Sequence, residues 1–391
     1  MSAAERMDAL NPAASPDPAA LRLGAALPEW NPDIDDALVV RAIRDETADV
    51  KTFVLAPRNP CVFRYEPGQF ITLDLTIGGE SINRCYTISS APTRPHTISI
   101  TVKRVPGGPV SNHLHDTLKV GSILRAVGPM GDFSCFRQGA PKPSPKYLFL
   151  SGGSGITPLM SMARTFHDLA EPRDIAFVHA ARSPADIVFR NELELMARNQ
   201  PSHFRFAPIC EGDSPLQPWH GLRGRLNLGL LNHIAPDYKA REIFVCGPSP
   251  FMAAVREMLK GAGFDMARHH EESFDFAELA NAEPEIAAEV IAAEIVADIA
   301  KPAAVTYQIE FAKAKRTIEC SSDMFVLDAA RRAGVRLPSS CSKGLCGTCK
   351  SKLVSGTVDM KHGGGIRQRE IDAGMALLCC SKPTSDLVVD R

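Results

Sequence analysis

Hydrophobic and polar residues alternate in short segments through the first third of the chain. The clearest segments are Thr52-Phe-Val-Leu55, Phe70-Ile-Thr-Leu-Asp-Leu75 and Thr97-Ile-Ser-Ile-Thr-Val102. They are rich in β-branched residues, and turn sequences such as Pro67-Gly68 lie between them, as is typical of antiparallel strands. Their regular spacing predicts a small antiparallel β-barrel over residues 37–140.

The pattern changes after the proline-rich segment Pro141-Lys-Pro-Ser-Pro145. A strand-like run, Tyr147-Leu-Phe-Leu150, is followed by a glycine turn and then by apolar residues at helical spacing from Leu159. Strand and helix patterns continue to alternate as far as residue 259. Because strands that alternate with helices form parallel sheets, we predict an α/β domain over residues 141–276.

The rest of the chain divides into an extension, a linker and a third domain. Residues 1–36 carry seven acidic and two basic residues and predict a flexible extension. Residues 277–304 contain eleven alanines among twenty-eight residues and predict an interdomain linker. Residues 305–391 predict a small domain with a strand near Tyr307, one helix and a cysteine-rich loop.

Composition narrows the class of protein. The 391 residues are 45% hydrophobic and 23% charged, with a net charge of −1. This balance disfavours a nucleic-acid binder that relies on bulk positive charge. No apolar run approaches the roughly 20 residues that a membrane span needs, and the first residues lack an apolar signal core. We therefore expect a cytoplasmic protein that binds neither nucleic acid nor membrane.

The cysteines carry the strongest chemical signal. Cys341, Cys346 and Cys349 have the spacing C-x4-C-x2-C, and Cys379 follows at a distance, which is the plant-type [2Fe–2S] arrangement. A zinc site usually has two C-x2-C pairs, whereas the second group here is the adjacent pair Cys379-Cys380. A redox-active dithiol would leave Cys341 unexplained. An iron–sulfur cluster is favoured over zinc and over ordinary buried cysteines.

The sequence Cys341-Ser-Lys-Gly-Leu-Cys-Gly-Thr-Cys349 resembles the cluster loop of plant-type ferredoxins, which implies a β-grasp fold. In that family a ligand stands four residues before a proline, and Pro383 then selects Cys379, although an exchange with Cys380 stays open. Residues 305–391 carry fourteen basic and nine acidic residues. We therefore expect a partner that docks here to present an acidic surface.

Three segments of the predicted barrel carry residues suited to a flavin. In Arg84-Cys-Tyr-Thr87, the arginine can bind a phosphate and the tyrosine can contact an aromatic ring. Gly107-Gly-Pro-Val-Ser111 opens a helix, whose N-terminus favours anions. Gly128-Pro-Met-Gly-Asp-Phe133 follows. Their order and spacing resemble the ferredoxin–NADP reductase superfamily.

That resemblance implies FAD, preferred over FMN, with the hydroxyl of Thr87 near the N5 atom of the flavin as a catalytic group. It implies that Phe274 covers the flavin. The residues expected to bind FAD are Arg84, Tyr86, Thr87, Gly108, Val110, Ser111 and Phe274.

A second glycine-rich segment, Ser151-Gly-Gly-Ser-Gly-Ile-Thr-Pro158, lies between a predicted strand and a predicted helix. Such a turn lets backbone amides approach a pyrophosphate. Cys246-Gly-Pro248 resembles another motif of the superfamily, which implies that Cys246 is catalytic and lies beside the nicotinamide C4 atom. The residues expected to bind NAD(P)H are Gly152, Gly153, Gly155, Ile156, Thr157, Pro158, Arg182, Asp186, Cys246, Gly247 and Pro248.

The preferred nucleotide depends on charges after the second α/β strand. Arg182 and Ser183 could hold a 2′-phosphate, whereas Asp186 suits a free ribose hydroxyl. We expect NADH, with NADPH as the alternative.

The three predicted modules together resemble the reductase components of two-component Rieske oxygenases, particularly the glycine betaine or stachydrine demethylase type. The resemblance implies an oxidoreductase that passes electrons from NADH through FAD and a [2Fe–2S] cluster to a terminal oxygenase or another redox metalloprotein, which docks near the ferredoxin domain. Two alternatives stay open, namely the reductase of hybrid-cluster protein and a redox-sensing subunit without significant turnover.

Overall fold

The computed structural model describes residues 27–32, 34–136, 146–273, 305–337, 344, 349–362, 366 and 368–391. The chain divides into two compact units, Met1–Ser273 and Phe274–Arg391. The predicted linker 277–304, most of the predicted extension, Phe274, Cys341 and Cys346 lie outside the described residues. In the described parts of the chain, no helix is both long enough and apolar enough to cross a membrane.

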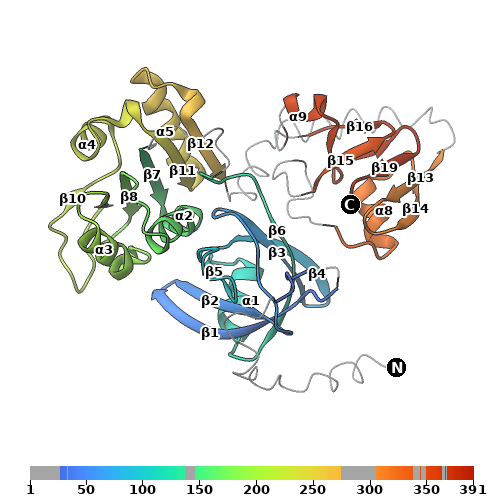
Figure 1. Cartoon of the computed structure of the whole chain (residues 1–391), viewed down its shortest axis with the longest axis horizontal. Helices are drawn as coiled ribbons and strands as arrows, with labels where there is room; N and C mark the ends of the chain where they lie inside the picture. Colours follow the sequence, from blue (N-terminus) through green and yellow to red (C-terminus); the bar gives the residue numbers. More distant parts are fainter. Residues whose placement is uncertain are drawn as a thin grey trace. The chain divides into compact units, whose positions relative to one another are not determined.

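The first unit begins with a six-stranded antiparallel sheet in the order β4-β3-β6-β1-β2-β5 (Figure 1). Ile88, directly after β4, bridges Ile100 on β5 and so brings the two edge strands together. Alternate side chains such as Phe53, Leu55 and Ile71 are buried inside, which confirms the predicted barrel. Its elements are β1 (Ala37–Thr47), β2 (Val50–Pro57), β3 (Phe70–Ile77), β4 (Glu80–Thr87), β5 (Ile98–Lys103), α1 (Pro109–Thr117) and β6 (Ile123–Met130).

Part of the predicted flexible extension is fixed to this barrel. The N–H of Trp30 donates to the carbonyl of Val62, and the N–H of Val62 donates to the carbonyl of Pro28. The indole of Trp30 is buried and lies 5.1 Å from the ring of Phe63, centroid to centroid. Burying an aromatic side chain favours this attachment despite the local acidity.

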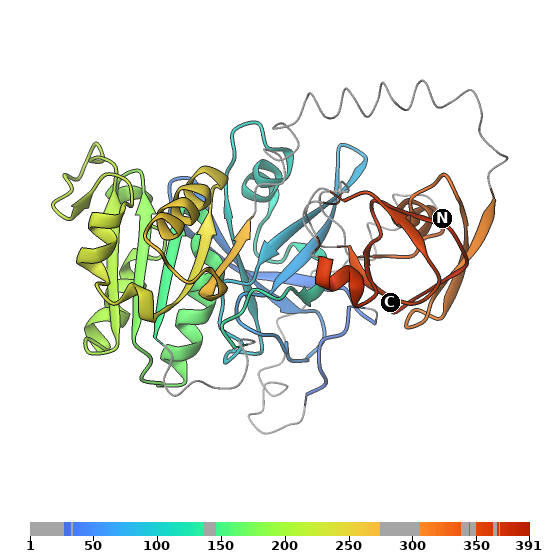
Figure 2. The ribbon, with the colours of Figure 1, turned by 90° about the horizontal axis from the view of Figure 1, so that it is seen from above.

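The second half of the first unit is a parallel sheet in the order β10-β9-β8-β7-β11-β12. Side chains that alternate along β7 face opposite layers: Phe149 packs with helix α2, whereas Leu148 and Leu150 pack with α5. Helices therefore cover both faces (Figure 2), as predicted for an α/β domain. The elements are β7 (Tyr147–Gly152), α2 (Ile156–Asp168), β8 (Ile175–Ala181), α3 (Arg190–Asn199), β9 (Phe204–Cys210), β10 (Leu222–Arg223), α4 (Leu228–Ile234), β11 (Glu242–Gly247), α5 (Ser249–Gly261) and β12 (His269–Ser273).

Helix α2 joins the parallel sheet to the barrel. The buried guanidinium of Arg164 donates through Nη1 to the carbonyl of Ser89 (2.6 Å) and through Nε and Nη2 to the carboxylate of Glu192 (2.8 and 2.6 Å). The hydroxyl of Ser161 donates to the carbonyl of Ser90 at 2.6 Å. Both carbonyls belong to the segment that directly follows Thr87, so one helix fixes the end of β4 against the α/β domain.

The second unit has a five-stranded sheet in the order β14-β13-β19-β15-β17 and a separate pair, β16 and β18. Helix α8 covers the main sheet, and its Val326 and Leu327 are buried with Ile309, Phe311 and Leu377. This arrangement agrees with the predicted β-grasp fold. The elements are β13 (Thr306–Phe311), β14 (Arg316–Ser321), α8 (Val326–Arg332), β15 (Lys350–Ser355), β16 (Val358–Met360), α9 (Gln368–Asp372), β17 (Met375–Leu377), β18 (Ser381–Pro383) and β19 (Leu387–Val389).

Replacing Arg164 tests this attachment. Arg164→Met should destabilise the first unit by about 2 kcal/mol, because it leaves the partly buried Glu192 carboxylate and the Ser89 carbonyl without their donor. Urea unfolding followed by tryptophan fluorescence measures this unit selectively, since both tryptophans of the chain, Trp30 and Trp219, belong to it. The control is Lys260→Met, which removes an exposed pair with Glu257 and should cost less than about 0.5 kcal/mol. Equal losses in the two variants would contradict the prediction.

Candidate functional site

Two predicted glycine motifs meet at the centre of the parallel sheet. The strand order reverses between β7 and β11, and ligands of open α/β sheets bind at such a point, beyond the carboxyl ends of the strands. A Cβ atom on Gly155 would lie 2.4 Å from the backbone C and O atoms of Cys246. Only glycine permits this approach, which brings the segments Ser151–Pro158 and Cys246–Pro248 together.

The start of α2 lies at this contact. Ile156, Thr157 and Pro158 are the first residues of the helix and are buried. Gly153, with φ of +52°, makes the turn that precedes it. The first turn of α2 holds no acidic residue, so the positive end of its dipole favours an anion such as a pyrophosphate.

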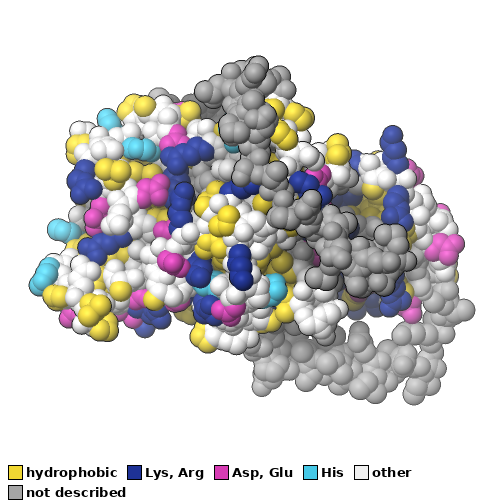
Figure 3. Space-filling view, turned by 90° about the horizontal axis from the view of Figure 1, so that it is seen from below, with side chains coloured by type: hydrophobic (Ala, Val, Ile, Leu, Met, Phe, Trp, Pro, Cys, Tyr) yellow, Lys and Arg dark blue, Asp and Glu magenta, His cyan; other side chains and the backbone are white. Residues whose placement is uncertain are grey.

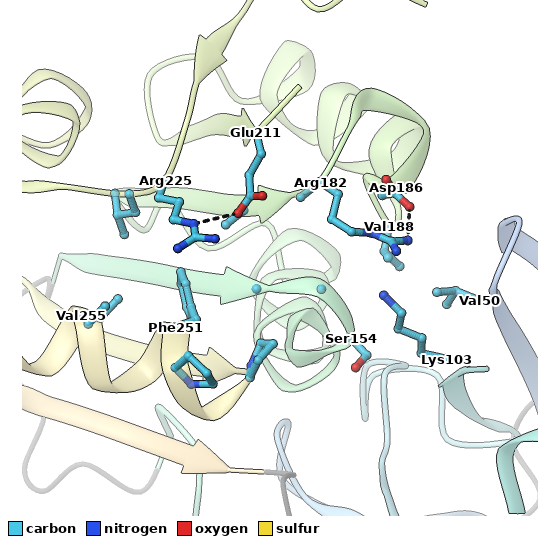
Figure 4. A pocket seen from close by; sticks show the side chains of 18 of the residues that line it. Val50, Lys103, Ser154, Arg182, Asp186, Val188, Glu211, Arg225, Phe251 and Val255 are labelled. Carbon is cyan, nitrogen blue, oxygen red and sulfur yellow. Dashed lines mark hydrogen bonds and ion pairs between the residues drawn. The ribbon is translucent and has the colours of Figure 1, made fainter. Parts of the chain in front are cut away.

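A cavity of about 380 Å³ opens beside these loops. Gly152, Gly153 and Pro248 line it, together with the ring of Phe251. Figure 4 shows Arg182 and Asp186 on one side of this cavity and the side chain of Lys103 reaching in from the barrel. The cavity therefore combines several residues that the sequence predicted for nucleotide binding with residues that it did not predict. The latter include Asp49, Lys103, Glu211, Arg225 and Phe251.

Each arginine of the cavity has a carboxylate partner. Arg182 Nη2 donates to Asp186 Oδ1 (2.6 Å) and to Asp49 Oδ2 (3.3 Å). Arg225 Nε donates to Glu211 Oε1 at 3.1 Å. Burial alone would raise the pKa of Asp186, but hydrogen bonds from Ser183 and Arg182 lower it below its usual value. Asp186 is thus an ionised acceptor at neutral pH.

The predicted flavin residues occupy the barrel. Thr87 is buried at the end of β4, and its hydroxyl has no hydrogen-bond partner among the described residues. Burial raises the pKa of the neighbouring Tyr86, whereas the side chain of Arg84 is exposed. A buried hydroxyl without a partner fits a site that a ligand completes.

The second predicted phosphate loop begins α1. Gly108 precedes the helix, and Val110 is buried in the barrel core with Ile71. The hydroxyl of Ser111 accepts a hydrogen bond from the N–H of Val105 at 3.0 Å, so it fixes the loop. The helix begins with Pro109 and has no acidic residue in its first turn, which favours an anion there.

Glu272 is a candidate site residue that sequence reasoning missed. It is the register partner of the buried Cys246 in the parallel pair β11–β12. Its Oε2 atom is shielded from solvent and has no hydrogen-bond partner among the described residues. Burial and the charge of Asp132 raise the pKa of Glu272 to about 8. Only the strand register reveals this position, and the sequence does not fix which residues of two distant strands are paired.

Two of the four predicted cluster ligands lie together. Cys349 and Cys379 are buried, and the N–H of Cys379 donates to the sulfur of Cys349 at 3.5 Å. The N–H of Gly344 donates to the sulfur of Cys379 at 3.2 Å. Backbone donors of this kind stabilise thiolate ligands. The sulfur of Cys380, by contrast, donates to the carbonyl of Leu377 at 3.6 Å, which favours Cys379 as the ligand.

Comparisons with known proteins match the three parts of the chain separately. The oxidoreductase FAD-binding domain family matches residues 37–135, and the oxidoreductase NAD-binding domain family matches residues 149–257. The 2Fe-2S iron-sulfur cluster binding domain family matches residues 309–384. These matches show that the chain binds FAD, a nicotinamide dinucleotide and a [2Fe–2S] cluster, as predicted.

Relatives of similar length contain all three parts. The glycine betaine monooxygenase reductase subunit of Pseudomonas aeruginosa is 46% identical over 356 residues, which cover 90% of this chain and 94% of that protein. The stachydrine N-demethylase reductase subunit of Rhizobium meliloti is 41% identical over 345 residues, covering 88% and 93%. The solved structure of phthalate dioxygenase reductase shares the fold, with a TM-score of 0.53, 23% identity and coverage of 93% and 100%.

The chain is 46% and 41% identical to these two subunits over nearly its whole length, and its domains follow in the order FAD, NAD and 2Fe-2S. This similarity identifies the activity. The chain is an electron-transfer oxidoreductase and belongs to the family of three-domain reductase components of monooxygenases.

Proposed function

We propose that this reductase supplies electrons to the oxygenase component of a system that demethylates a quaternary ammonium compound such as glycine betaine or stachydrine. The observation that carries the proposal is the identity of 46% and 41% to two reductase subunits of such systems, across nearly their whole length. Two reductases that recognise the same type of oxygenase need similar residues on their docking surfaces.

Reconstitution tests the choice of acceptor. The purified chain is mixed with NADH and with the oxygenase component of a glycine betaine or a stachydrine system, and loss of the methylated substrate is measured. Turnover with one of them supports the proposal. Reduction of cytochrome c without turnover of either oxygenase would contradict it and would direct the search to another metalloprotein.

The first unit supplies the groups that bind and orient the two nucleotides. Arg84, Tyr86 and Thr87, with Gly108, Val110 and Ser111, would hold the FAD. The loops Gly152–Pro158 and Cys246–Pro248 would hold the NADH, with Lys103 as a further cation in the cavity. When bound, these cofactors supply the hydride acceptor and donor. Cys246 and Thr87 are the residues that we place at the reacting atoms.

The charges of the cavity support the preference for NADH. Arg182 is held by Asp186 and Asp49, and Arg225 is held by Glu211. A 2′-phosphate would have to displace carboxylates that are already paired, whereas a ribose hydroxyl can donate to one of them. Anaerobic titration with each nucleotide in turn, followed by flavin absorbance, measures this preference directly.

The adjacent cysteines offer a matched pair of variants for the cluster. Cys379→Ala should abolish the absorption of the cluster and the reduction of cytochrome c, while NADH-driven reduction of ferricyanide through the flavin continues. Cys380→Ala should keep all three properties, because its sulfur points to the carbonyl of Leu377. Both side chains are buried to a similar extent, so a packing defect would affect them alike. Loss of the cluster in the Cys380 variant alone would reverse the ligand assignment.

Glu272 should give the reaction a pH dependence. Because its pKa is raised to about 8, the carboxyl group holds its proton at pH 7 and loses it as the pH rises through 8. The new negative charge beside Asp132 opposes binding of the anionic nucleotide, so the KM for NADH should rise about fivefold, the effect of roughly 1 kcal/mol of repulsion.

Glu272→Gln keeps the shape of the side chain and cannot ionise, so its KM should stay constant between pH 7 and 9. The measurement is steady-state ferricyanide reduction at varied NADH concentration. A parent protein whose KM does not change over this range would refute the role of Glu272.

A further inference from the structure

Arg391 lies beside the segment that carries the proposed ligand Cys349. Its Nη2 atom donates to the carbonyl of Lys350 at 2.5 Å, and its Nε atom donates to the hydroxyl of Ser351 at 3.0 Å. Ser351 in turn donates to the carbonyl of Cys349 at 3.2 Å. The guanidinium therefore holds both residues that follow this cysteine along β15.

The backbone of Arg391 is also fixed. Its carbonyl accepts the N–H groups of Lys313 (2.7 Å) and Ala314 (3.0 Å), which form the turn after β13. The side chain thus extends from an anchored position at the end of β19 across to β15, and ordering it costs little further entropy. A cation placed by a fixed backbone and two hydrogen bonds has one defined position relative to Cys349.

The charge of this guanidinium acts on the cysteine. Burial lowers the pKa of Arg391, whereas the charge of Asp390 and, after it, that of Cys349 act to raise it. The neighbouring cation Lys350 has its own partner, because its Nζ atom donates to Glu370 at 2.7 Å. Asp390, next to Arg391, is paired with Lys313 at 3.2 Å. Arg391 donates instead to neutral groups, a carbonyl and a hydroxyl.

We propose that Arg391 is a positioning residue that holds the Cys349 segment and raises the reduction potential of the [2Fe–2S] cluster. The proposal depends on the assignment of Cys349 as a ligand. Reduction adds one electron to a group whose thiolate and sulfide ligands already make it anionic, and a nearby fixed cation stabilises the more negative state. Cys349 and Cys379 are themselves buried, and burial strengthens the interaction of a charge with them.

The experiment is a redox titration of the full-length holoprotein followed by the EPR signal of the reduced cluster. In Arg391→Gln the ratio of reduced to oxidised cluster at a fixed potential should fall about tenfold, which is a shift of roughly 59 mV for one electron. Arg391→Lys keeps the charge and should shift the ratio by less than about threefold, or roughly 28 mV.

Lys315→Gln is the matched control. It removes the same charge from an exposed side chain in the turn after β13, leaves the pair of Lys313 and Asp390 intact and should leave the potential unchanged. An equal shift in this control, or an unchanged potential in Arg391→Gln, would overturn the proposal. If Arg391→Gln does not retain iron, Ser351→Ala decides: it removes the acceptor of Nε, and it should lower the ratio about twofold, by roughly 18 mV, whereas no change would overturn the proposal.

Two outcomes distinguish the ligand assignment of Cys349 from the role of Arg391. A parent protein that contains flavin but shows no EPR signal of a reduced cluster would overturn the ligand assignment and this inference with it. A parent protein with the signal, and with a potential that does not respond to Arg391, would overturn this inference alone.

Discussion

The arrangement of the first unit depends on the buried guanidinium of Arg164. It donates to the carbonyl of Ser89, two residues beyond Thr87, and to the carboxylate of Glu192 on α3. Helix α2, which carries Arg164, begins at the glycine turn of the proposed nucleotide site. One rigid helix therefore sets the distance between the residues proposed for the flavin and those proposed for NADH, and hydride transfer between two bound groups depends strongly on that distance.

Local chemistry made much of this protein predictable. The β-branched alternation, the glycine turns and the cysteine spacing all express requirements of a few neighbouring residues, so they can be read from the sequence. Gly153 is an example, since its φ of +52° favours a glycine whatever lies opposite. Gly155 has ordinary helical dihedral angles, and only the structure shows why it is a glycine: the backbone of Cys246 lies at a distance that no Cβ atom would tolerate.

The features that could not be predicted from the sequence depend on strand register and on contacts between distant segments. Lys103 ends a barrel strand, yet it lines a cavity of the α/β domain with Asp49. Glu272 becomes chemically interesting only because β12 places it beside Cys246. Trp30 belongs to a segment whose acidity suggests a flexible chain, and the apolar surface near Phe63 is what fixes it. No pattern within a short window contains these pairings.

Figure 3 shows basic and acidic side chains interspersed on the face of the first unit that it draws, and the cavity follows the same rule, with each arginine beside a carboxylate. Such pairing leaves little net field to attract anions in general. Binding of a dinucleotide then depends on the shape of the glycine loops and on the helix dipole at the start of α2, which act only at short range. At the proposed cluster, Arg391 donates to a carbonyl and a hydroxyl near Cys349. The two sites thus use charge differently. In the nucleotide cavity, paired charges select a ligand that must bind and leave. At the cluster, we propose that a fixed cation changes the reduction potential of a permanently bound group.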